Sequence, residues 1–306
     1  MQLPPRIRRA IEERADDVGF PALKRAATEL SEAYREGKSA RLSGEDEITA
    51  YLATRMPATY AAARAVLGEL RGMEIASVLD VGAGTGAAAL AAREIFPNAE
   101  KVTLIERDPA LAETALSFLP GAIAIHADLG RMTTLPAHDL VVAAWSLGEI
   151  PRAPAARLWE AARVALVVIE PGTPRGAAMI RQVREELLGA GAHMIAPCPA
   201  AMGCPLTEPD WCHFAERVER SSLHRRLKDG ALGYEDEKYS YVALAREPFA
   251  RGWARVLRRP QHHAGLIELR LCTPAGVEPV RVARRDRTAF RAARKAEWGG
   301  RYWTGA

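Results

Sequence analysis

The sequence predicts an α/β fold built on a mostly parallel sheet, and two observations carry this prediction. Short β-rich runs recur between residues 75 and 170, and several of the segments between them have a helical pattern. The first run ends in a glycine-rich segment that is followed at once by an alanine-rich helix. This alternation is typical of a parallel sheet that helices cover on both faces.

The chain has 306 residues, of which 48% are hydrophobic. That length allows one good core and an appendage, or roughly two domains. We expect an N-terminal helical region over residues 1–72, a central α/β domain over 73–247, and a basic β-rich appendage over 248–306. Within the central domain, residues 191–228 form a cysteine-rich insertion. No stretch approaches the roughly 18 uncharged apolar residues of a membrane span.

Helices are expected first along the chain, over residues 5–37 and 45–72. Apolar side chains such as Ile7, Ile11 and Leu23 recur there at roughly helical spacing among charged residues. Ser43, followed three residues later by Asp46, gives a capping signature for the second helix.

The first predicted strand ends in the sharpest local motif, Val78-Leu79-Asp80-Val81-Gly82-Ala83-Gly84-Thr85-Gly86. Its three glycines allow the backbone to turn tightly and approach a ligand at the start of the following helix. With Ala87 in the last place, the same letters also satisfy the dinucleotide pattern G-x-G-x-x-G/A.

Three acidic residues favour S-adenosylmethionine over a dinucleotide. Asp80 stands two residues before the first glycine, where it could accept from the amino acid end of the cofactor. Glu106 closes the next strand and suits two ribose hydroxyls, and Asp128 follows the third strand, within reach of the adenine amino group. Each acid alone would also serve as an ordinary strand-end or capping residue. Together they resemble the class I S-adenosylmethionine-dependent methyltransferases over residues 75–170, which implies a Rossmann-like fold.

The end of the fourth strand, residues 144–150, should face the methyl group that is transferred. It departs from the Asn/Asp-Pro-Pro-aromatic motif of amino-methylating nucleic-acid enzymes, and no nearby cysteine offers a nucleophile for covalent cytosine chemistry. Glu149 would act as a general base, or it would be a structural carboxylate that makes hydrogen bonds within its own loop. Trp145, a candidate cofactor-binding residue, would stack a base or pack in the loop. No catalytic residue is assigned.

Beyond the fifth strand we expect a helix to about Leu188, a strand over 238–246, basic strands over 253–259, 266–272 and 280–284, and a basic helix ending near Trp298. Residues 251–306 hold 13 Lys or Arg against 4 Asp or Glu, whereas the whole chain carries only +4. This tail would neutralise a run of phosphates or form a solvated basic face. Its arginines include Arg258, Arg259, Arg281, Arg284, Arg285, Arg287, Arg291 and Arg294.

Four cysteines are the chain's most informative feature: Cys198, Cys204 and Cys212 lie within fifteen residues, and Cys272 follows sixty residues later. The opening MQLPPRIRRAIEERADD has no apolar core of a secretory signal, so we expect a reducing cytoplasm rather than disulfides. Four thiolates suit zinc or an iron–sulfur cluster. The spacings lack the C-x₂-C pair of most zinc sites, and a trio of buried thiols without metal is the alternative.

The residues around the cysteines resemble a methyltransferase-like family that is associated with the small ribosomal subunit in bacteria and mitochondria. The similar segments run from residues 51–57 through Cys204-Pro205-Leu206, Asp210-Trp211-Cys212-His213-Phe214 and residues 217–225 and 233–241 to the basic tail. The mitochondrial members are assembly factors of that subunit and carry a four-iron four-sulfur (4Fe-4S) cluster. Its ligands correspond in order and approximate spacing to Cys198, Cys204, Cys212 and Cys272.

The resemblance implies an S-adenosylmethionine-binding protein that binds the small ribosomal subunit and its rRNA, with no membrane partner. We expect an rRNA methyltransferase, or a non-catalytic assembly factor on a methyltransferase scaffold. A third alternative is a zinc-stabilised methyltransferase for a protein or a small molecule. Residues 221–228 should form a basic helix just beyond the third thiol, held in place by the cluster.

Overall fold

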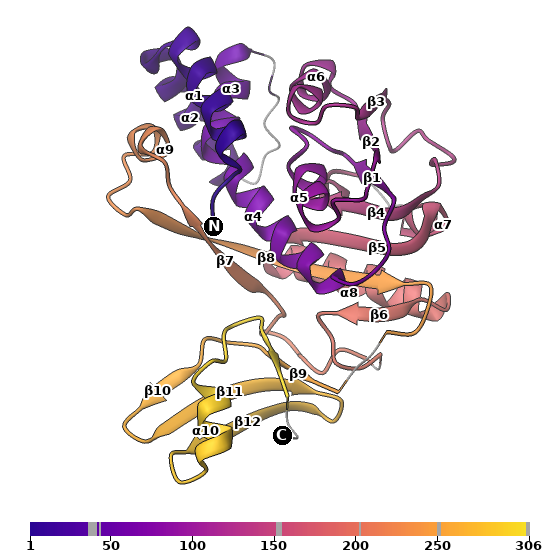
Figure 1. Ribbon diagram of the computed structural model, residues 1–306, viewed down its shortest axis with the longest axis vertical. Helices are drawn as coiled ribbons and strands as arrows, with labels where there is room; N and C mark the ends of the chain where they lie inside the picture. The colour runs from indigo at the N-terminus through magenta and orange to yellow at the C-terminus, as the bar shows by residue number, and fades with distance from the viewer. Residues whose placement is uncertain (36–41, 43, 151–154, 202, 250–251, 304–306) are drawn as a thin grey trace.

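The computed structural model describes residues 1–35, 42, 44–150, 155–201, 203–249 and 252–303. A helical bundle and a large α/β sheet lie side by side at one end of the long axis, and a smaller β-rich layer lies at the other end (Figure 1). Among the described residues, no helix combines the length and the apolar character that crossing a bilayer requires.

The N-terminal bundle consists of α1 (Pro5–Val18), α2 (Phe20–Arg35), α3 (Glu45–Thr54) and α4 (Met56–Leu67), followed by the 3₁₀ turn η1 (Gly68–Leu70). The two long helices predicted here are therefore each divided in two. Gly19 ends α1 at φ 85°, a conformation that glycine adopts without steric cost. Between α3 and α4, Pro57 supplies no backbone N–H and sits in the first turn, where none is needed.

The start of α3 corrects the predicted capping signature by one residue. Gly44 is the N-cap, and the Glu47 carboxylate accepts a hydrogen bond from the Gly44 N–H at 3.1 Å. The prediction from Ser43 and Asp46 is therefore wrong, and Ser43 itself lies outside the described residues. Acidic residues in the first turn complement the positive end of the helix dipole.

The large sheet has the strand order β3-β2-β1-β4-β5-β8-β6, with β7 pairing to β8. The strands β1 to β5 are parallel, and β8 runs antiparallel to both β5 and β6. This order, with one reversed strand near the edge, is that of the class I methyltransferase fold, so the fold predicted from the sequence is confirmed. The strand bounds are β1 Ser77–Val81, β2 Lys101–Glu106, β3 Ile123–His126, β4 His138–Ala144, β5 Ala162–Pro171, β6 His193–Ala196, β7 Phe214–Glu219 and β8 Tyr234–Ala245.

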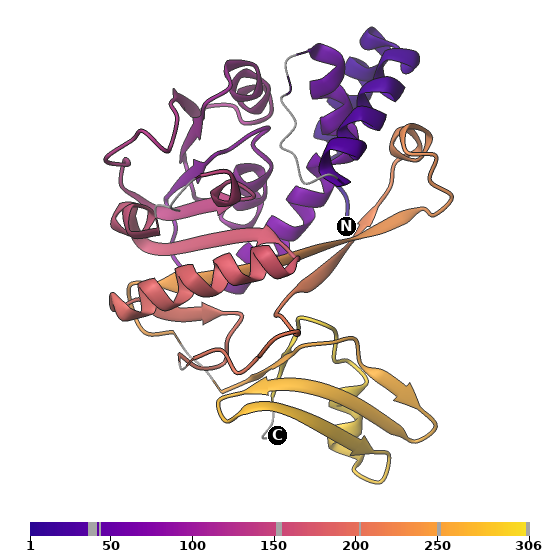
Figure 2. The ribbon, with the colours of Figure 1, turned by 180° about the vertical axis from the view of Figure 1, so that it is seen from behind.

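Helices cover both faces of this sheet, and each face has its own apolar core. Successive side chains of a strand point to opposite faces of the sheet. Val78 therefore belongs to the core under α4 and α5 (Ala87–Ile95). Its neighbour Leu79 belongs to the core under α7 (Ala155–Ala161) and α8 (Pro174–Gly189). The helix α6 (Pro109–Phe118) lies beside β2 and β3. Figure 2 shows α8 lying across the face turned toward the viewer.

A long hairpin of β7 and β8 extends from the sheet to the helical bundle, with α9 (Ser222–Leu227) near its tip (Figure 1). There α9 packs on α2 and α3, and Lys24 Nζ donates to the carbonyl of Leu227 at 2.8 Å. The predicted basic helix does form, but its expected position beside the third thiol is wrong. The strand β7 lies between Cys212 and α9 and carries the chain away from the cysteines.

The C-terminal residues form a second sheet with the order β10-β11-β9-β13, in which β12 pairs to β11. It has a small core of its own, to which α10 contributes Ala293. The predicted basic strands are present, although the helix ends at Ala293 rather than near Trp298. The division of the chain at residues 72 and 247 stays a prediction. The bounds are β9 Ala254–Val256, β10 Gln261–His263, β11 Leu266–Thr273, β12 Gly276–Ala283, α10 Arg287–Ala293 and β13 Arg301–Tyr302.

Candidate functional site

The glycine loop after β1 is held in a left-handed conformation, with φ of 68° at Gly82, 54° at Gly84 and 77° at Gly86. A methyl group on Gly82 would lie 2.4 Å from Ser146 Cβ, and one on Gly86 would lie 3.0 Å from Ala115 Cβ. A methyl group on Gly84 would meet no atom within 4 Å. The outer glycines are therefore fixed by packing, whereas Gly84 leaves open space beside the loop.

Asp80 lies beneath this loop and is only 1% exposed. Its Oδ2 accepts a hydrogen bond from the backbone N–H of Ala89 at 2.9 Å, which ties the end of β1 to α5. Burial raises the pKa of Asp80 to about 7, against the lowering effect of the Ala89 hydrogen bond and with a further increase from the charge of Glu106.

The other two predicted cofactor acids lie at the same edge of the sheet, Glu106 as the last residue of β2 and Asp128 just after β3. Glu106 accepts from the backbone N–H of Gly84 at 2.7 Å and from that of Asp108 at 2.9 Å. Asp128 accepts from the Gly130 N–H at 2.8 Å. In parallel sheets the carboxyl ends of neighbouring strands form the ligand-binding edge, and these acids flank the glycine loop there.

The loop after β4 is shaped by a buried carboxylate that the sequence analysis missed. Glu170, at the end of β5, is 3% exposed and accepts from the N–H groups of Leu147 at 3.0 Å and Gly148 at 3.3 Å. Trp145 has a φ of 55° and donates its backbone N–H to the Ile169 carbonyl. Glu170 lies within the apolar strand β5, and a single acid in such a strand gives no signal in the sequence. The side chain of Glu149 lies outside the described residues.

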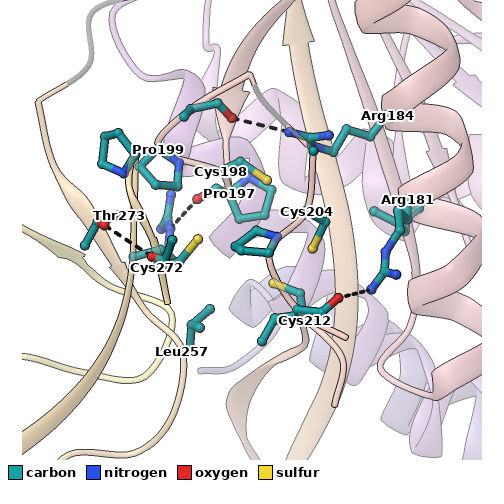
Figure 3. Close-up of a pocket in the computed structure, with 18 of the residues that line it drawn as sticks. Arg181, Arg184, Pro197, Cys198, Pro199, Cys204, Cys212, Leu257, Cys272 and Thr273 are labelled. Atoms are coloured by element: carbon teal, nitrogen blue, oxygen red, sulfur yellow. Dashed lines mark hydrogen bonds between the residues drawn. The ribbon is translucent and has the colours of Figure 1, made fainter. Parts of the chain in front are cut away.

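All four cysteines line one pocket of about 120 Å³ (Figure 3). Cys198, Cys204 and Cys212 come from the connection between β6 and β7 in the large sheet, and Cys272 comes from β11 in the C-terminal sheet. The pocket therefore lies between two parts of the chain that are distant in sequence. Leu206 and Leu257 form a small apolar cluster with Cys272, against which Cys204 and Cys212 pack.

Three arginines also line the thiol pocket. Arg181 and Arg184 reach it from α8 and donate to the carbonyls of Leu206 and Ala200. Arg255 reaches it from β9, is 1% exposed, and donates from Nε to the Pro197 carbonyl at 2.9 Å. Positive charge therefore surrounds a group of thiols that becomes strongly negative when it binds metal as thiolates.

Burial raises the pKa of Cys198, raises that of Cys212 well above its usual value, and raises that of Cys272 to about 12. Negative charge on neighbouring thiolates adds to the increase, whereas Arg184 opposes it at Cys198 and Cys272, and Arg255 opposes it at all three. Cys198, Cys212 and Cys272 therefore stay protonated until a cation displaces their protons. Among the described residues, no group of three or more His, Cys, Asp or Glu is already arranged to hold a metal ion, so the four thiols share a pocket without forming a preformed ion site.

The cysteine segment is anchored to both sheets. Trp211 Nε1 donates to the Gly172 carbonyl after β5 at 3.0 Å. Asp210 forms ion pairs with Arg258 and with Arg270, the latter at 2.8 Å, and both arginines belong to the C-terminal sheet region. These contacts fix the segment between the sheets.

A basic surface lies on and around α10, which packs on β11 and β12 of the C-terminal sheet, and we call it the α10 surface. Six exposed cations form it, and none of them makes an ion pair with another described residue: Arg284, Arg285, Arg287, Arg291, Arg294 and Lys295. Asp286 is the only acid in this stretch, and it caps α10. Six other basic residues of the tail pair with acids instead: Arg255, Arg258, Arg259, Arg270, Arg281 and Arg301. Arg251 lies outside the described residues.

The chain is similar to solved methyltransferase structures, although each likeness is limited. A S-adenosylmethionine-dependent methyltransferase from Aquifex aeolicus is 15% identical, with 64% of this chain and 95% of that chain covered and a TM-score of 0.40. A TehB-like methyltransferase from Corynebacterium glutamicum is 14% identical, with 74% and 100% covered and a TM-score of 0.40. The strand order therefore carries the fold assignment, not these likenesses.

Two curated relatives from Schizosaccharomyces pombe, the mitochondrial Rsm22-cox11 tandem proteins 1 and 2, are each 25% identical to the chain. The alignment covers 86% of this chain, which spans 44% of the length of those relatives. A family model described as "Mitochondrial small ribosomal subunit Rsm22" matches residues 45–303. That match includes the glycine loop, all four cysteines and the α10 surface, and on this basis the chain belongs to the Rsm22 family.

Proposed function

We propose that this protein binds S-adenosylmethionine, holds a four-iron four-sulfur cluster on Cys198, Cys204, Cys212 and Cys272, and binds the small ribosomal subunit through its rRNA. The observation that supports the proposal most is that one chain of the Rsm22 family brings four distant thiols to a single pocket. The four thiols without the family match, or the glycine loop without the thiols, would give the proposal weaker support.

The residues at the sheet edge fit S-adenosylmethionine. Gly84 leaves open space beside the loop, Glu106 ends β2 where a ribose would lie, and Asp128 follows β3 where an adenine would lie. Asp80 is buried and holds the loop in place through its hydrogen bond from the Ala89 N–H, so it would support the cofactor site indirectly. Bound there, the cofactor would supply an electrophilic methyl group.

The donor set of the thiol pocket fits an iron–sulfur cluster. Cluster irons in proteins are held by cysteine thiolates, and four are present here. Arg255 has a buried Nη2 without a hydrogen-bond partner among the described residues, which is the donor that a sulfur-rich anion would satisfy. Zinc remains the alternative metal, and iron and sulfide analysis separates the two.

The α10 surface supports the rRNA part of the proposal. Its six cations have no acidic partner in the described part of the chain, so binding phosphates would break no internal ion pair. Neutralising phosphates with arginine and lysine releases counterions, and this release supplies much of the affinity of proteins for nucleic acids. RNA backbone is therefore the partner whose charge complements this surface.

The proposed activity is rRNA methylation, and a non-catalytic role in subunit assembly is the second candidate. The second candidate is favoured by the thiol pocket and the α10 surface, because neither includes a residue of the glycine loop and both would contribute to binding rather than to methyl transfer. The loop after β4 would face the nucleotide in the first case. Glu170 would hold that loop in shape through the N–H groups of Leu147 and Gly148.

The test is transfer of labelled methyl from S-adenosylmethionine to small subunits purified from cells that lack this protein. Protein is prepared without oxygen, and its iron and sulfide are measured first. Label in the rRNA that is lost in Glu106→Gln would establish the enzyme. Subunit binding without label would establish the assembly role. Failure to bind subunits, by protein that contains iron and sulfide, would overturn the ribosomal part of the proposal.

A further inference from the structure

Arg255 is a buried arginine that joins three parts of the chain. Its Nε donates to the carbonyl of Pro197, next to Cys198, and its Nη1 donates to Glu69 at 2.6 Å and to the Gly299 carbonyl at 2.5 Å. The guanidinium carbon lies 4.5 Å from the centre of the Trp253 ring. Two of its three nitrogens are therefore fully engaged, and the plane of the guanidinium is fixed.

The third nitrogen, Nη2, is buried and has no hydrogen-bond partner among the described residues. A buried donor of a charged group that is left without a hydrogen-bond partner destabilises the folded protein. Arg255 also lines the thiol pocket together with all four cysteines. Because the Nε and Nη1 atoms are bound to Pro197, Glu69 and Gly299, Nη2 is the part of the side chain left for a ligand in that pocket.

We propose that Arg255 donates a hydrogen bond from Nη2 to a sulfur atom of the metal centre on the four cysteines and thereby raises its reduction potential. This inference rests on the proposed cluster. A cluster bound by four thiolates becomes more negative when it takes up one electron, and no atom is transferred in that step. A fixed cation and an N–H donor stabilise the reduced state more than the oxidised state, so both raise the potential.

Glu69 determines how much of the charge on Arg255 reaches the pocket. Its carboxylate pairs with Arg255 at 2.6 Å and with Arg301 at 2.5 Å, so one negative charge is shared between two arginines. Arg301 does not line the thiol pocket. Replacing Arg255 and replacing Glu69 therefore change the charge near the pocket in opposite directions.

The experiment is a redox titration with dithionite, followed by electron paramagnetic resonance, on protein whose iron and sulfide content is known. We expect a more negative potential for Arg255→Gln, because the cation and the donor are lost. We expect a more positive potential for Glu69→Gln, because Arg255 is then less neutralised. Arg301→Gln should shift the potential less than either. Non-specific loosening of the structure would not give shifts of opposite sign.

Equal potentials in wild type, Arg255→Gln and Glu69→Gln would overturn the inference while leaving the cluster in place. If Arg255→Gln does not retain its cluster, the sign of the Glu69→Gln shift decides alone. Protein that contains zinc instead of iron would refute the proposed cluster separately. In that case the rate of metal loss to a chelator should rise in Arg255→Gln and not in Arg301→Gln, and equal rates would overturn the role of Arg255.

Discussion

The carboxylate of Glu106 accepts a hydrogen bond from the backbone N–H of Gly84, with 2.7 Å between Glu106 Oε2 and the Gly84 nitrogen. The same carboxylate accepts from Asp108, so it joins the glycine loop to the end of β2. Glu106→Gln replaces one acceptor oxygen by a donor. We expect it to weaken S-adenosylmethionine binding by roughly 10- to 100-fold, as for a hydrogen bond to a charged group. Calorimetry measures this affinity, with the exposed Glu113→Gln as the control. Wild-type affinity in Glu106→Gln would contradict the proposed role.

Gly82 is held against Ser146, and a methyl group on Gly82 would lie 2.4 Å from Ser146 Cβ. Gly82→Ala should therefore destabilise the fold by about 1–3 kcal/mol through overpacking, and its positive φ adds strain. Adding Ser146→Gly removes the clashing atom and should restore part of the loss. Chemical denaturation measures both variants. The idea fails if the double variant is as unstable as the sum of the two single variants.

The pKa of Asp80 gives a pH dependence of stability with a definite sign. Burial raises its pKa from 3.8 to about 7 in the folded protein, so between these values the folded protein holds a proton that the unfolded chain releases. The free energy of unfolding should therefore fall as the pH rises through this window, by up to about 4 kcal/mol from this group. Asp80→Asn should remove this slope and gain stability relative to wild type as the pH rises.

Thermal denaturation of both proteins between pH 4 and pH 8 checks this expectation. Glu100→Gln, at an exposed carboxyl group, controls for the loss of one charge. A stability difference between Asp80→Asn and wild type that does not change with pH would contradict it.

Loss of one cysteine should affect RNA binding as well as metal content. In Cys212→Ser the metal centre loses one of four ligands, and the link between the cysteine segment and Cys272 in the C-terminal sheet is weakened. We expect loss of iron and a decrease in RNA affinity of roughly tenfold. Ser240→Ala is the control, because it removes a hydrogen bond to the Cys212 carbonyl and leaves the sulfur intact. Unchanged RNA affinity after loss of iron would refute the coupling.

The α10 surface predicts how RNA binding depends on salt. Each phosphate contact in a single strand contributes about −0.7 to the slope of log affinity against log salt. Changing Arg287, Arg291 and Arg294 to glutamine should therefore reduce the slope by about 2 and weaken binding to a single-stranded fragment of small-subunit rRNA. The control removes three exposed arginines elsewhere, Arg9, Arg163 and Arg225. Equal slopes for the two triple variants would show that RNA does not bind this surface.

The central fold could be predicted because its strands are short apolar runs that end in polar residues. Burial on both faces gives β1 a continuous apolar pattern, and the glycine loop marks its end. The breaks at Gly19 and Arg55 were missed because the apolar spacing continues through them, and only backbone geometry shows where each helix ends. The position of α9 was missed because it depends on how far the β7 and β8 hairpin extends.

The candidate site was predictable where residue type alone carries the chemistry. The four cysteines were identified from the sequence, and the structure brings all four to one pocket. Glu170 and Arg255 were not identified, because a single acid or arginine in an apolar strand gives no signal until its hydrogen bonds are known. The basic tail was identified as a whole, but which cations stay available depends on contacts with acids such as Glu69 and Asp210.

The thiol pocket also sets an order of events during synthesis of the chain. Cys272 is translated sixty residues after Cys212, and it takes its place only when β11 has paired with β9 and β12, which extends to Ala283. A nascent chain that has emerged only as far as the large sheet therefore presents three thiols and lacks the fourth. A metal centre that needs all four cysteines could then bind only after the C-terminal sheet has formed, so chains truncated before Cys272 would stay without metal.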